Sequence, residues 1–258
     1  MIDVVTDSNP HHDEPTAASS ATAPVRRKRS AAGGLITAVR ETVLVVAVAL
    51  VVSLVVKTFL LQAFFIPSES MEQTLDIGDR VIVSKLTPGP FDLHRGDVIV
   101  FSDPGGWLTA TTPTQRGPVG TVVAGALTFV GLLPEDSDDH LIKRVIGLPG
   151  DHVTSDGQGP VVVNGTPVEE SAYLAAGELP SQDQPFDVVV PAGRLWVMGD
   201  NRSHSCDSRC NTDTPSGGFV PLDLVTGRAY AVVWPLSHGA WLGTPDVFDA
   251  VPDASEIS

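Results

Sequence analysis

The sequence predicts a mostly β protein, in which an N-terminal transmembrane helix precedes an antiparallel β-rich domain. Residues 42–66 form the longest apolar run of the chain, and a helix of that length can cross a bilayer. After this run, short segments rich in Val and Ile alternate with loops that contain Gly and Pro, a pattern typical of strands joined by turns. Helical spacing of apolar residues is scarce there, so we expect few further helices.

The N-terminal segment, residues 1–41, is predicted to be a disordered cytoplasmic tail. Residues 1–24 contain no Lys or Arg and are rich in Asp, Ser, Thr, Ala and Pro, a composition that cannot bury a core. A basic cluster at residues 26–29 and Arg40 precede the apolar run. By the positive-inside rule, the N-terminus is cytoplasmic and the domain after the span is extracytoplasmic.

We interpret residues 42–66 as a single-pass anchor in the cell membrane. Lys57 is the only charged residue in this run, and its long side chain can reach toward the outer interface. A cleaved signal peptide is the alternative. It is disfavoured because the segment before the run is long and begins acidic, and because no clear small-x-small site follows the run.

Beyond the span, we place one β-rich domain at residues 67–243. It carries an inserted loop at 102–140, which we expect near the membrane, and an inserted β subdomain at 151–195. An acidic C-terminal tail, residues 244–258, is expected to be loose. The predicted strands are residues 80–84, 97–101, 141–146, 161–165, 188–190, 195–198 and 229–234.

Charge and cysteine content exclude two classes of function. The net charge is −15 and no basic stripe lies outside residues 26–29, so nucleic acid is not an expected partner. Cys206 and Cys210 are the only cysteines, too few for a cysteine-based metal framework. They could be free thiols, but we favour a disulfide in an extracytoplasmic domain.

Ser70 is a candidate nucleophile because it follows the apolar run directly, in the turn at residues 67–71. A serine nucleophile needs a general base and donors for the oxyanion. His204 lies among Asp and Ser residues and suggests a Ser-His-Asp arrangement. Lys143 is the stronger candidate, because a strand lysine that faces an apolar interior has a lowered pKa. A surface lysine on an edge strand is the bland alternative.

Five segments in the same order resemble the conserved boxes of bacterial type I signal peptidases. Several ordered motifs are far more specific than one short pattern. The resemblance covers the chain from the span to about Tyr230 and is weak in residues 102–140. Gln73 stands where a proline is common, which would loosen that turn. The five segments are residues 67–75, 78–81, 95–101, 142–151 and 199–209.

The resemblance implies roles for individual residues. Ser70 would be the nucleophile and Lys143 the general base, as in the serine–lysine branch of the family, which leaves His204 as a loop residue. The Ser70 N–H and the Ser68 hydroxyl would form the oxyanion hole, and Ser205 would orient the Lys143 amine. Asp207 and Arg209 would brace that shell and Asp200 would hold the segment's fold. The apolar positions implied to line shallow substrate pockets are Phe64, Ile66, Leu75 and Ile142.

These observations predict a membrane-anchored serine endopeptidase that cleaves N-terminal signal peptides from exported preproteins after a small residue. Its expected partners are preprotein signal peptides and membrane lipid, and we expect a monomer that uses no metal or cofactor. Self-cleaving repressors related to LexA are one alternative, which the missing helix-turn-helix disfavours. An anchored β domain that only binds a partner is another, and its function would survive loss of Ser70 or Lys143.

Overall fold

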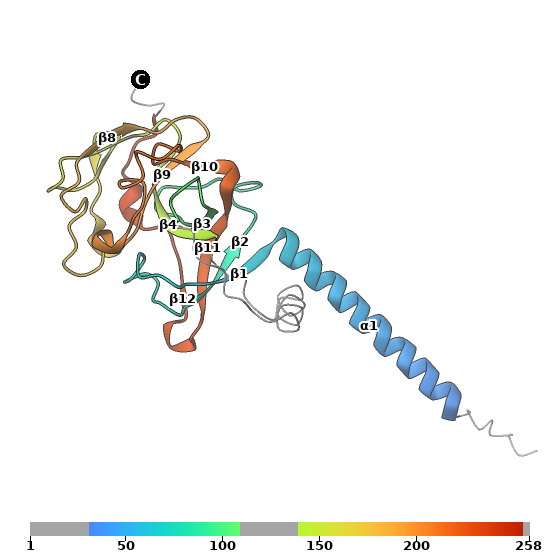
Figure 1. The fold of residues 1–258 in the computed structure, drawn as a ribbon. Helices are drawn as coiled ribbons and strands as arrows, with labels where there is room; N and C mark the ends of the chain where they lie inside the picture. Colours follow the sequence, from blue (N-terminus) through green and yellow to red (C-terminus); the bar gives the residue numbers. More distant parts are fainter. Residues whose placement is uncertain (1–30, 109–138, 255–258) are drawn as a thin grey trace, which may run out of the picture. The chain divides into compact units, whose positions relative to one another are not determined.

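The structure is a computed structural model that describes residues 31–108 and 139–254. The chain separates into two units, residues 1–45 and 46–258. A single α-helix, α1 (Ala31–Phe59), runs through the end of the first unit and into the second (Figure 1). Residues 31–41 are therefore helical in the structure, so the expectation that the disordered tail extends to residue 41 is wrong. The rest of that tail lies outside the described residues.

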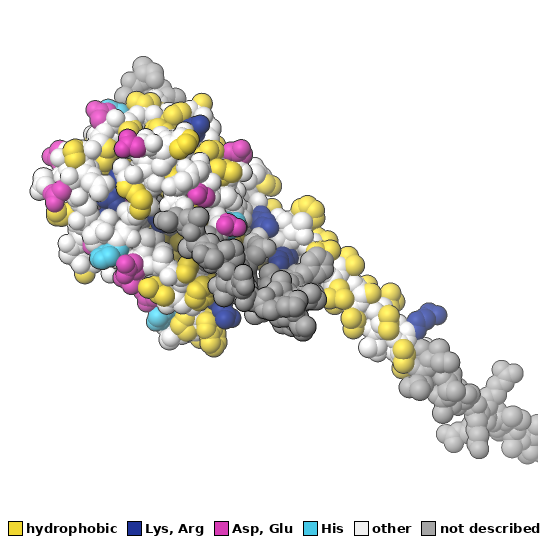
Figure 2. All heavy atoms as spheres, in the orientation of Figure 1, with side chains coloured by type: hydrophobic (Ala, Val, Ile, Leu, Met, Phe, Trp, Pro, Cys, Tyr) yellow, Lys and Arg dark blue, Asp and Glu magenta, His cyan; other side chains and the backbone are white. Residues whose placement is uncertain are grey.

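The helix α1 contains a stretch, Thr37–Phe59, that is long and apolar enough to cross a membrane. Most Val and Leu side chains of this stretch are exposed, and Figure 2 shows hydrophobic side chains along the helix. An apolar surface of this kind has no packing partner within a water-soluble fold, so its composition suits lipid.

The predicted C-terminal end of the span at Ile66 is wrong. The helix ends at Phe59, and Leu61–Phe65 is a strand, β1, that pairs antiparallel with β2 (Arg80–Ser84). Along β1 the side chains of Gln62 and Phe64 are buried while Leu61 and Phe65 are exposed. This alternation has the period of a strand. Apolar content alone could not separate it from the helix before it.

Two antiparallel sheets make up the β-rich domain, which confirms the expected fold class. The larger sheet has the order β1-β2-β11-β3-β4-β9-β10, with β12 paired to β11, and the smaller has the order β7-β6-β5-β8. Strands expected at residues 80–84, 97–101, 141–146, 195–198 and 229–234 all occur, within a residue or as part of a longer strand. The remaining strands of the large sheet are β3 (Val98–Ser102), β4 (His140–Gly147), β9 (Arg194–Met198), β10 (Val220–Pro221), β11 (Val225–Trp234) and β12 (Ala240–Trp241).

The smaller sheet and the short 3-10 helices complete the described elements. The sheet comprises β5 (His152–Ser155), β6 (Val162–Val163), β7 (Thr166–Pro167) and β8 (Phe186–Val189). The 3-10 helices are η1 (Glu170–Ala172), η2 (Arg202–His204), η3 (Leu222–Leu224), η4 (Leu236–His238) and η5 (Asp246–Phe248).

The central strand β3 is covered on both faces. Val98 and Val100 belong to one apolar cluster with Phe64, Met71 and other residues, whereas Ile99 and Phe101 belong to a second cluster. Successive side chains of a strand point to opposite faces. The uninterrupted apolar run of β3 is thus explained by burial on both sides, and the neighbouring strand β4 is buried with it.

The C-terminal segment is packed, not loose, as far as the structure describes it. Phe248 and Val251 are buried in a cluster with Trp196, and the rings of Phe248 and Tyr173 stack with centroids 6.2 Å apart. Arg95 binds Asp253 at 3.4 Å. Counting acidic residues could not reveal this packing, because two apolar side chains decide it.

We expect Phe248→Ala to lower the free energy of unfolding by about 3 kcal/mol, because it leaves a cavity among buried aromatic residues. Phe91→Ala is the matched control, since Phe91 is 59% exposed and should lose no more than about 0.5 kcal/mol. Chemical denaturation of the detergent-solubilised protein measures both values. Equal losses in the two variants would show that the C-terminal segment is not part of the core.

Candidate active site

Ser70 lies in the turn between β1 and β2 and is 5% exposed. The turn is tight: the N–H of Leu75 donates to the carbonyl of Met71 at 2.8 Å, and both side chains are buried in the core. Ser70 is therefore held by the packing of its neighbours. Gln73 has a φ of 86°, which a proline cannot adopt because its ring fixes φ near −65°.

Lys143 lies on β4 and meets Ser70 from the other side of the site. Its Nζ is 2.7 Å from the Ser70 Oγ and donates to the Ile142 carbonyl at 2.9 Å. The Ser68 and Ser70 hydroxyl oxygens are 3.2 Å apart. Three residues singled out in the sequence thus converge on one point, although Ser70 and Lys143 are 73 positions apart in the chain.

Burial changes the acid–base behaviour of Lys143. The side chain is 4% exposed, and loss of water lowers its pKa from 10.5 to about 8. The carboxylates of Asp207 and Asp200 oppose this shift, while the Arg209 guanidinium adds to it. A neutral amine at this position is therefore accessible near neutral pH.

A buried ion pair joins three segments of the site. Arg144 donates to both carboxylate oxygens of Asp200, at 2.8 and 2.6 Å, and to the Gly96 carbonyl at 2.7 Å. The Thr74 hydroxyl donates to the same carboxylate at 2.5 Å. Burial opposes and the Asp200 charge favours the cationic form, and the pKa of Arg144 ends above its usual value. The pair links β4, the Ser70 turn and the segment that begins at Gly199.

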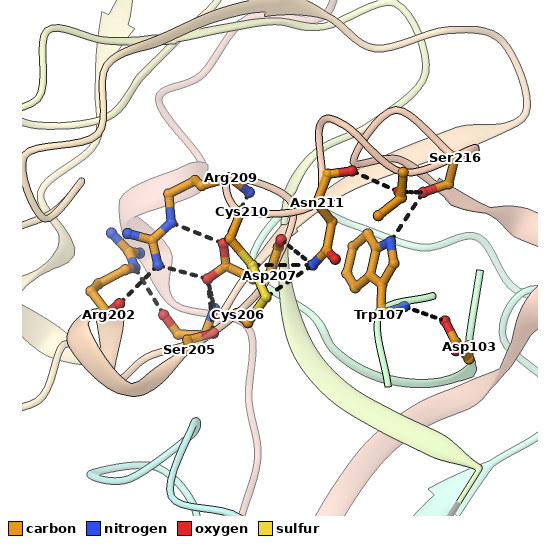
Figure 3. Close-up of a disulfide and its surroundings, with 12 residues drawn as sticks. Asp103, Trp107, Arg202, Ser205, Cys206, Asp207, Arg209, Cys210, Asn211 and Ser216 are labelled. Atoms are coloured by element: carbon orange, nitrogen blue, oxygen red, sulfur yellow. Dashed lines mark hydrogen bonds and ion pairs between the residues drawn. A yellow bond between two sulfur atoms is a disulfide. The ribbon is translucent and has the colours of Figure 1, made fainter. Parts of the chain in front are cut away.

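Asp207 is the centre of a second buried network, shown in Figure 3. Its carboxylate accepts hydrogen bonds from Arg209 Nε at 2.9 Å, the Gly199 N–H at 2.9 Å and the Ser205 hydroxyl at 2.8 Å. Burial by itself would raise the pKa of Asp207, but the bonds and charge of Arg209 outweigh it and hold the pKa below its usual value. The carboxylate is thus charged and fully engaged.

Gly199 brings this network against Ser70. A Cβ at Gly199 would lie 2.3 Å from the Ser205 Oγ and 2.5 Å from the Ser70 carbonyl oxygen, so no other residue fits. The Asn201 N–H donates to the same Ser70 carbonyl at 3.2 Å. Ser205 makes no hydrogen bond to Lys143 in the structure, since its hydroxyl donates to Asp207 instead.

An apolar pocket adjoins the Lys143 amine. Three of the four implied substrate-binding residues, Phe64, Ile66 and Ile142, line it; Leu75 shares a core cluster with them but does not line the pocket. The sequence did not single out Val100, Leu108 or His140 as lining residues; the last two lie in the segment where the resemblance is weak. The full lining is Phe64, Phe65, Ile66, Pro67, Ser68, Val100, Leu108, His140, Leu141, Ile142 and Lys143.

His204 lies apart from this arrangement. It is exposed at the end of η2, and its Nδ1 is 2.9 Å from the Ser203 hydroxyl and 3.1 Å from the Asn201 side-chain oxygen. Among the described residues, no group of three or more His, Cys, Asp or Glu side chains could hold a metal ion.

Comparison with known proteins identifies the family. Residues 39–234 match the model of signal peptidase, peptidase S26. The chain belongs to this family. A signal peptidase I of Mycobacterium tuberculosis is 38% identical over 77% of this chain and 74% of its own length, and a probable signal peptidase I of Mycobacterium leprae is 40% identical over 74% of each chain. A crystal structure of a signal peptidase I from Enterococcus faecalis covers 54% of this chain and 97% of its own at 25% identity, with a TM-score of 0.32.

The resemblance seen in the sequence is thereby confirmed, and the chain is a serine peptidase, a hydrolase. Membership also removes the two alternatives, a self-cleaving repressor and a non-enzymatic binding domain. Within the peptidase, the sequence missed the partners of the buried charges. Arg144 and Arg202 are both buried, and Arg202 pairs with Glu170 at 2.6 Å. The alternation of β4 could have indicated a partner for Arg144, because a buried Arg side chain requires a carboxylate as its partner.

The loop that carries Asp207 is closed by a disulfide between Cys206 and Cys210 (Figure 3). Asn211 lies beside it: its Nδ2 donates to the Asp207 carbonyl at 2.7 Å and is 3.4 and 3.3 Å from the two sulfurs. Both cysteines are exposed, so the disulfide lies at the surface, whereas the neighbouring Asp207 carboxylate is buried. The loop is therefore constrained at the position that supports Ser205 and Gly199.

We expect peptide mapping by mass spectrometry without reductant to find Cys206 linked to Cys210. Reduction should lower the free energy of unfolding by about 2 kcal/mol, the loop-closure value for so short a loop. The Cys206→Ser, Cys210→Ser double variant is the control, because reductant should leave its stability unchanged. Two alkylated thiols in the unreduced protein would contradict the expected bond.

Proposed function

We propose that this peptidase is anchored in the membrane by α1 and cleaves N-terminal signal peptides from exported preproteins after a small residue. Ser70 acts as nucleophile and Lys143 as general base. The observation that carries the proposal is the 2.7 Å contact between the Lys143 Nζ and the Ser70 Oγ in a buried setting. A nucleophile and base within hydrogen-bonding reach are the geometric requirement of this chemistry.

The lowered pKa of Lys143 supports its role as base. A protonated amine has no lone pair, so only the neutral form can accept the Ser70 proton. Its pKa of about 8 lets a useful fraction of the amine be neutral near pH 7. The Ile142 carbonyl accepts one N–H of Lys143 and fixes the direction of the amine.

In the proposed reaction, the Ser70 Oγ attacks the scissile carbonyl carbon while its proton passes to the Lys143 Nζ. The C–N bond then breaks, and Lys143 returns the proton to the departing amine. The acyl-enzyme that remains is hydrolysed by water, which Lys143 deprotonates in turn, and Ser70 regains its proton. Each step balances within the dyad, the peptide and one water.

The oxyanion formed on the carbonyl requires hydrogen-bond donors. The Ser70 N–H donates to no acceptor among the described residues, so it can donate to an incoming oxygen. The Ser68 hydroxyl lies 3.2 Å from the Ser70 Oγ on an exposed side chain, and a small rotation would aim it at the same oxygen. Ser205, Asp207 and Arg209 support this geometry through Gly199, and Asp200 does so through Arg144.

The apolar pocket and the anchor account for the choice of substrate. An apolar pocket lined by Phe64, Ile66 and Ile142 can accept small side chains and discriminate against bulkier ones. Signal peptides are membrane-embedded, so anchoring the peptidase through Thr37–Phe59 raises the effective concentration of both partners at the membrane surface. We propose a monomer with a cytoplasmic N-terminus and an extracytoplasmic catalytic domain.

Ser70→Ala and Lys143→Ala should each lower kcat/KM for a preprotein in detergent by about 10³-fold or more, because each removes half of the dyad. Gel-based cleavage assays measure the loss. Ser203→Ala is the matched control: Ser203 is exposed and its hydroxyl bonds Glu178, so cleavage should persist. Full activity in either dyad variant would overturn the assignment.

Lys143→Met separates loss of chemistry from loss of fold. Burial lowers the pKa of Lys143, so the unfolded chain binds this proton more tightly than the folded chain. The resulting cost to stability is fully present below about pH 8 and vanishes above pH 10.5. At pH 7, Lys143→Met should therefore be inactive yet no less stable, with a gain of up to roughly 3 kcal/mol. An inactive and strongly destabilised variant would contradict this account.

The pH profile of cleavage should follow the Lys143 amine. Below a pH of about 8, kcat/KM should rise roughly tenfold per pH unit as the amine loses its proton, and then level off. His204→Gln should keep the profile, because the exposed His204 is not the base. A profile that stays flat through neutral pH, or one that changes with His204, would refute Lys143 as base.

A further inference from the structure

The segment that follows β3 turns back toward the apolar pocket. Leu108, at the end of this segment, lines the pocket together with Ile142 and Lys143. Leu108 lies in residues 102–140, where the resemblance to the family is weak. It is therefore not among the substrate-binding residues that the resemblance implies. The pocket is therefore lined in part by a residue from outside the five family motifs.

We propose that Leu108 is a specificity-determining residue of the cleavage reaction, and that Asp103 and Trp107 are the positioning residues that hold it at the pocket. The proposal rests on the proposed function, because it takes the apolar pocket as the site for the small side chains of the substrate.

Asp103 folds the segment on itself. Its carboxylate accepts the backbone N–H groups of Gly105 at 2.9 Å, Gly106 at 3.2 Å, Trp107 at 2.9 Å and Leu108 at 3.3 Å. Both glycines have positive φ, 113° and 89°, which other residues adopt only with strain. Burial opposes and these bonds favour the carboxylate form, and the pKa of Asp103 ends below its usual value. The backbone of Leu108 is therefore tied directly to Asp103.

Trp107 ties the same segment to the body of the domain. Its ring is 7% exposed and meets Phe101 edge to face, with centroids 5.8 Å apart. The indole N–H donates to the Ser216 hydroxyl at 3.0 Å, and Ser216 is 2.9 Å from the Thr214 hydroxyl. Figure 3 shows Trp107 and Asp103 beside the loop that follows the disulfide.

These two anchors give Leu108 a fixed position next to the reacting groups. Ring packing, the indole hydrogen bond and the Asp103 bonds must all break before the Leu108 backbone can leave. A Leu108 side chain held in place excludes bulky substrate side chains, whereas a mobile one would move aside for them. Discrimination of this kind amounts to about 10- to 200-fold for one methylene group.

The test compares kcat/KM for three otherwise identical signal-peptide substrates: Ala at both P1 and P3, Val at P1, and Val at P3. Leu108→Ala should raise the Val-to-Ala ratio at one of these positions by about tenfold, because it removes three carbons from the pocket lining. Leu108→Phe should lower the same ratio below that of the unmodified peptidase. If neither ratio moves in either variant, the proposal is overturned.

The anchor has its own variant. Trp107→Phe keeps an aromatic ring against Phe101 but removes the indole N–H, so it should shift the ratio in the same direction as Leu108→Ala, with a smaller change. An unchanged ratio would remove Trp107 from the proposal. Leu179→Ala is the matched control, because Leu179 is 41% exposed and lies outside the pocket, so its ratios should equal those of the unmodified peptidase.

The outcome is distinguishable from failure of the proposed function. If Ser70→Ala remained active, the dyad would be wrong whatever the ratios did. If Ser70→Ala is inactive while the Leu108 ratios stay constant, the dyad stands and the role of Leu108 does not. Thermal unfolding of each variant identifies one that has not folded. If one of Leu108→Ala and Leu108→Phe fails to fold, the other still tests the proposal, because the two are expected to shift the ratio in opposite directions.

Discussion

The buried pair of Arg144 and Asp200 is the interaction on which the rest of the site depends. Both side chains are almost fully excluded from water, and each charge would be costly without the other. Their two hydrogen bonds fix β4 against the segment that begins at Gly199, and Thr74 adds the Ser70 turn. Lys143 is the residue before Arg144 on the same strand, so the pair also sets the position of the amine.

The site contains a buried carboxylate, Asp207, whose charge its neighbours stabilise, and a buried amine, Lys143, whose charge is destabilised by loss of water. Asp207 is satisfied by Arg209, Ser205 and the Gly199 N–H, and this network is closed at the surface by the disulfide. Lys143, by contrast, is buried, and among the described residues its hydrogen-bond partners are the Ser70 hydroxyl and the Ile142 carbonyl. The same loss of water that destabilises its charge makes its neutral form available as a base. Stability is thus given up at the residue that we propose as the general base.

The region where the family resemblance is weak has described residues at the site. Leu108 reaches the apolar pocket, and Trp107 connects it to the loop that follows Asp207 through Ser216. The described start of the inserted segment, residues 102–108, is therefore joined by a hydrogen bond to the chain that follows the disulfide. The five motifs contain Ser70 and Lys143, which we propose as the reacting groups, whereas Leu108 comes from outside these motifs.

The sequence by itself determined the β-rich class, most strands of the large sheet, and the residues that converge on Ser70, because each depends on local pattern or on an ordered set of motifs. It could not determine where α1 ends, since helix and strand are equally apolar on either side of Phe59. Nor could it find the partners of Arg144, the burial of Phe248 or the place of Leu108. Those are contacts between segments far apart in the chain, and only tertiary packing decides which of them meet.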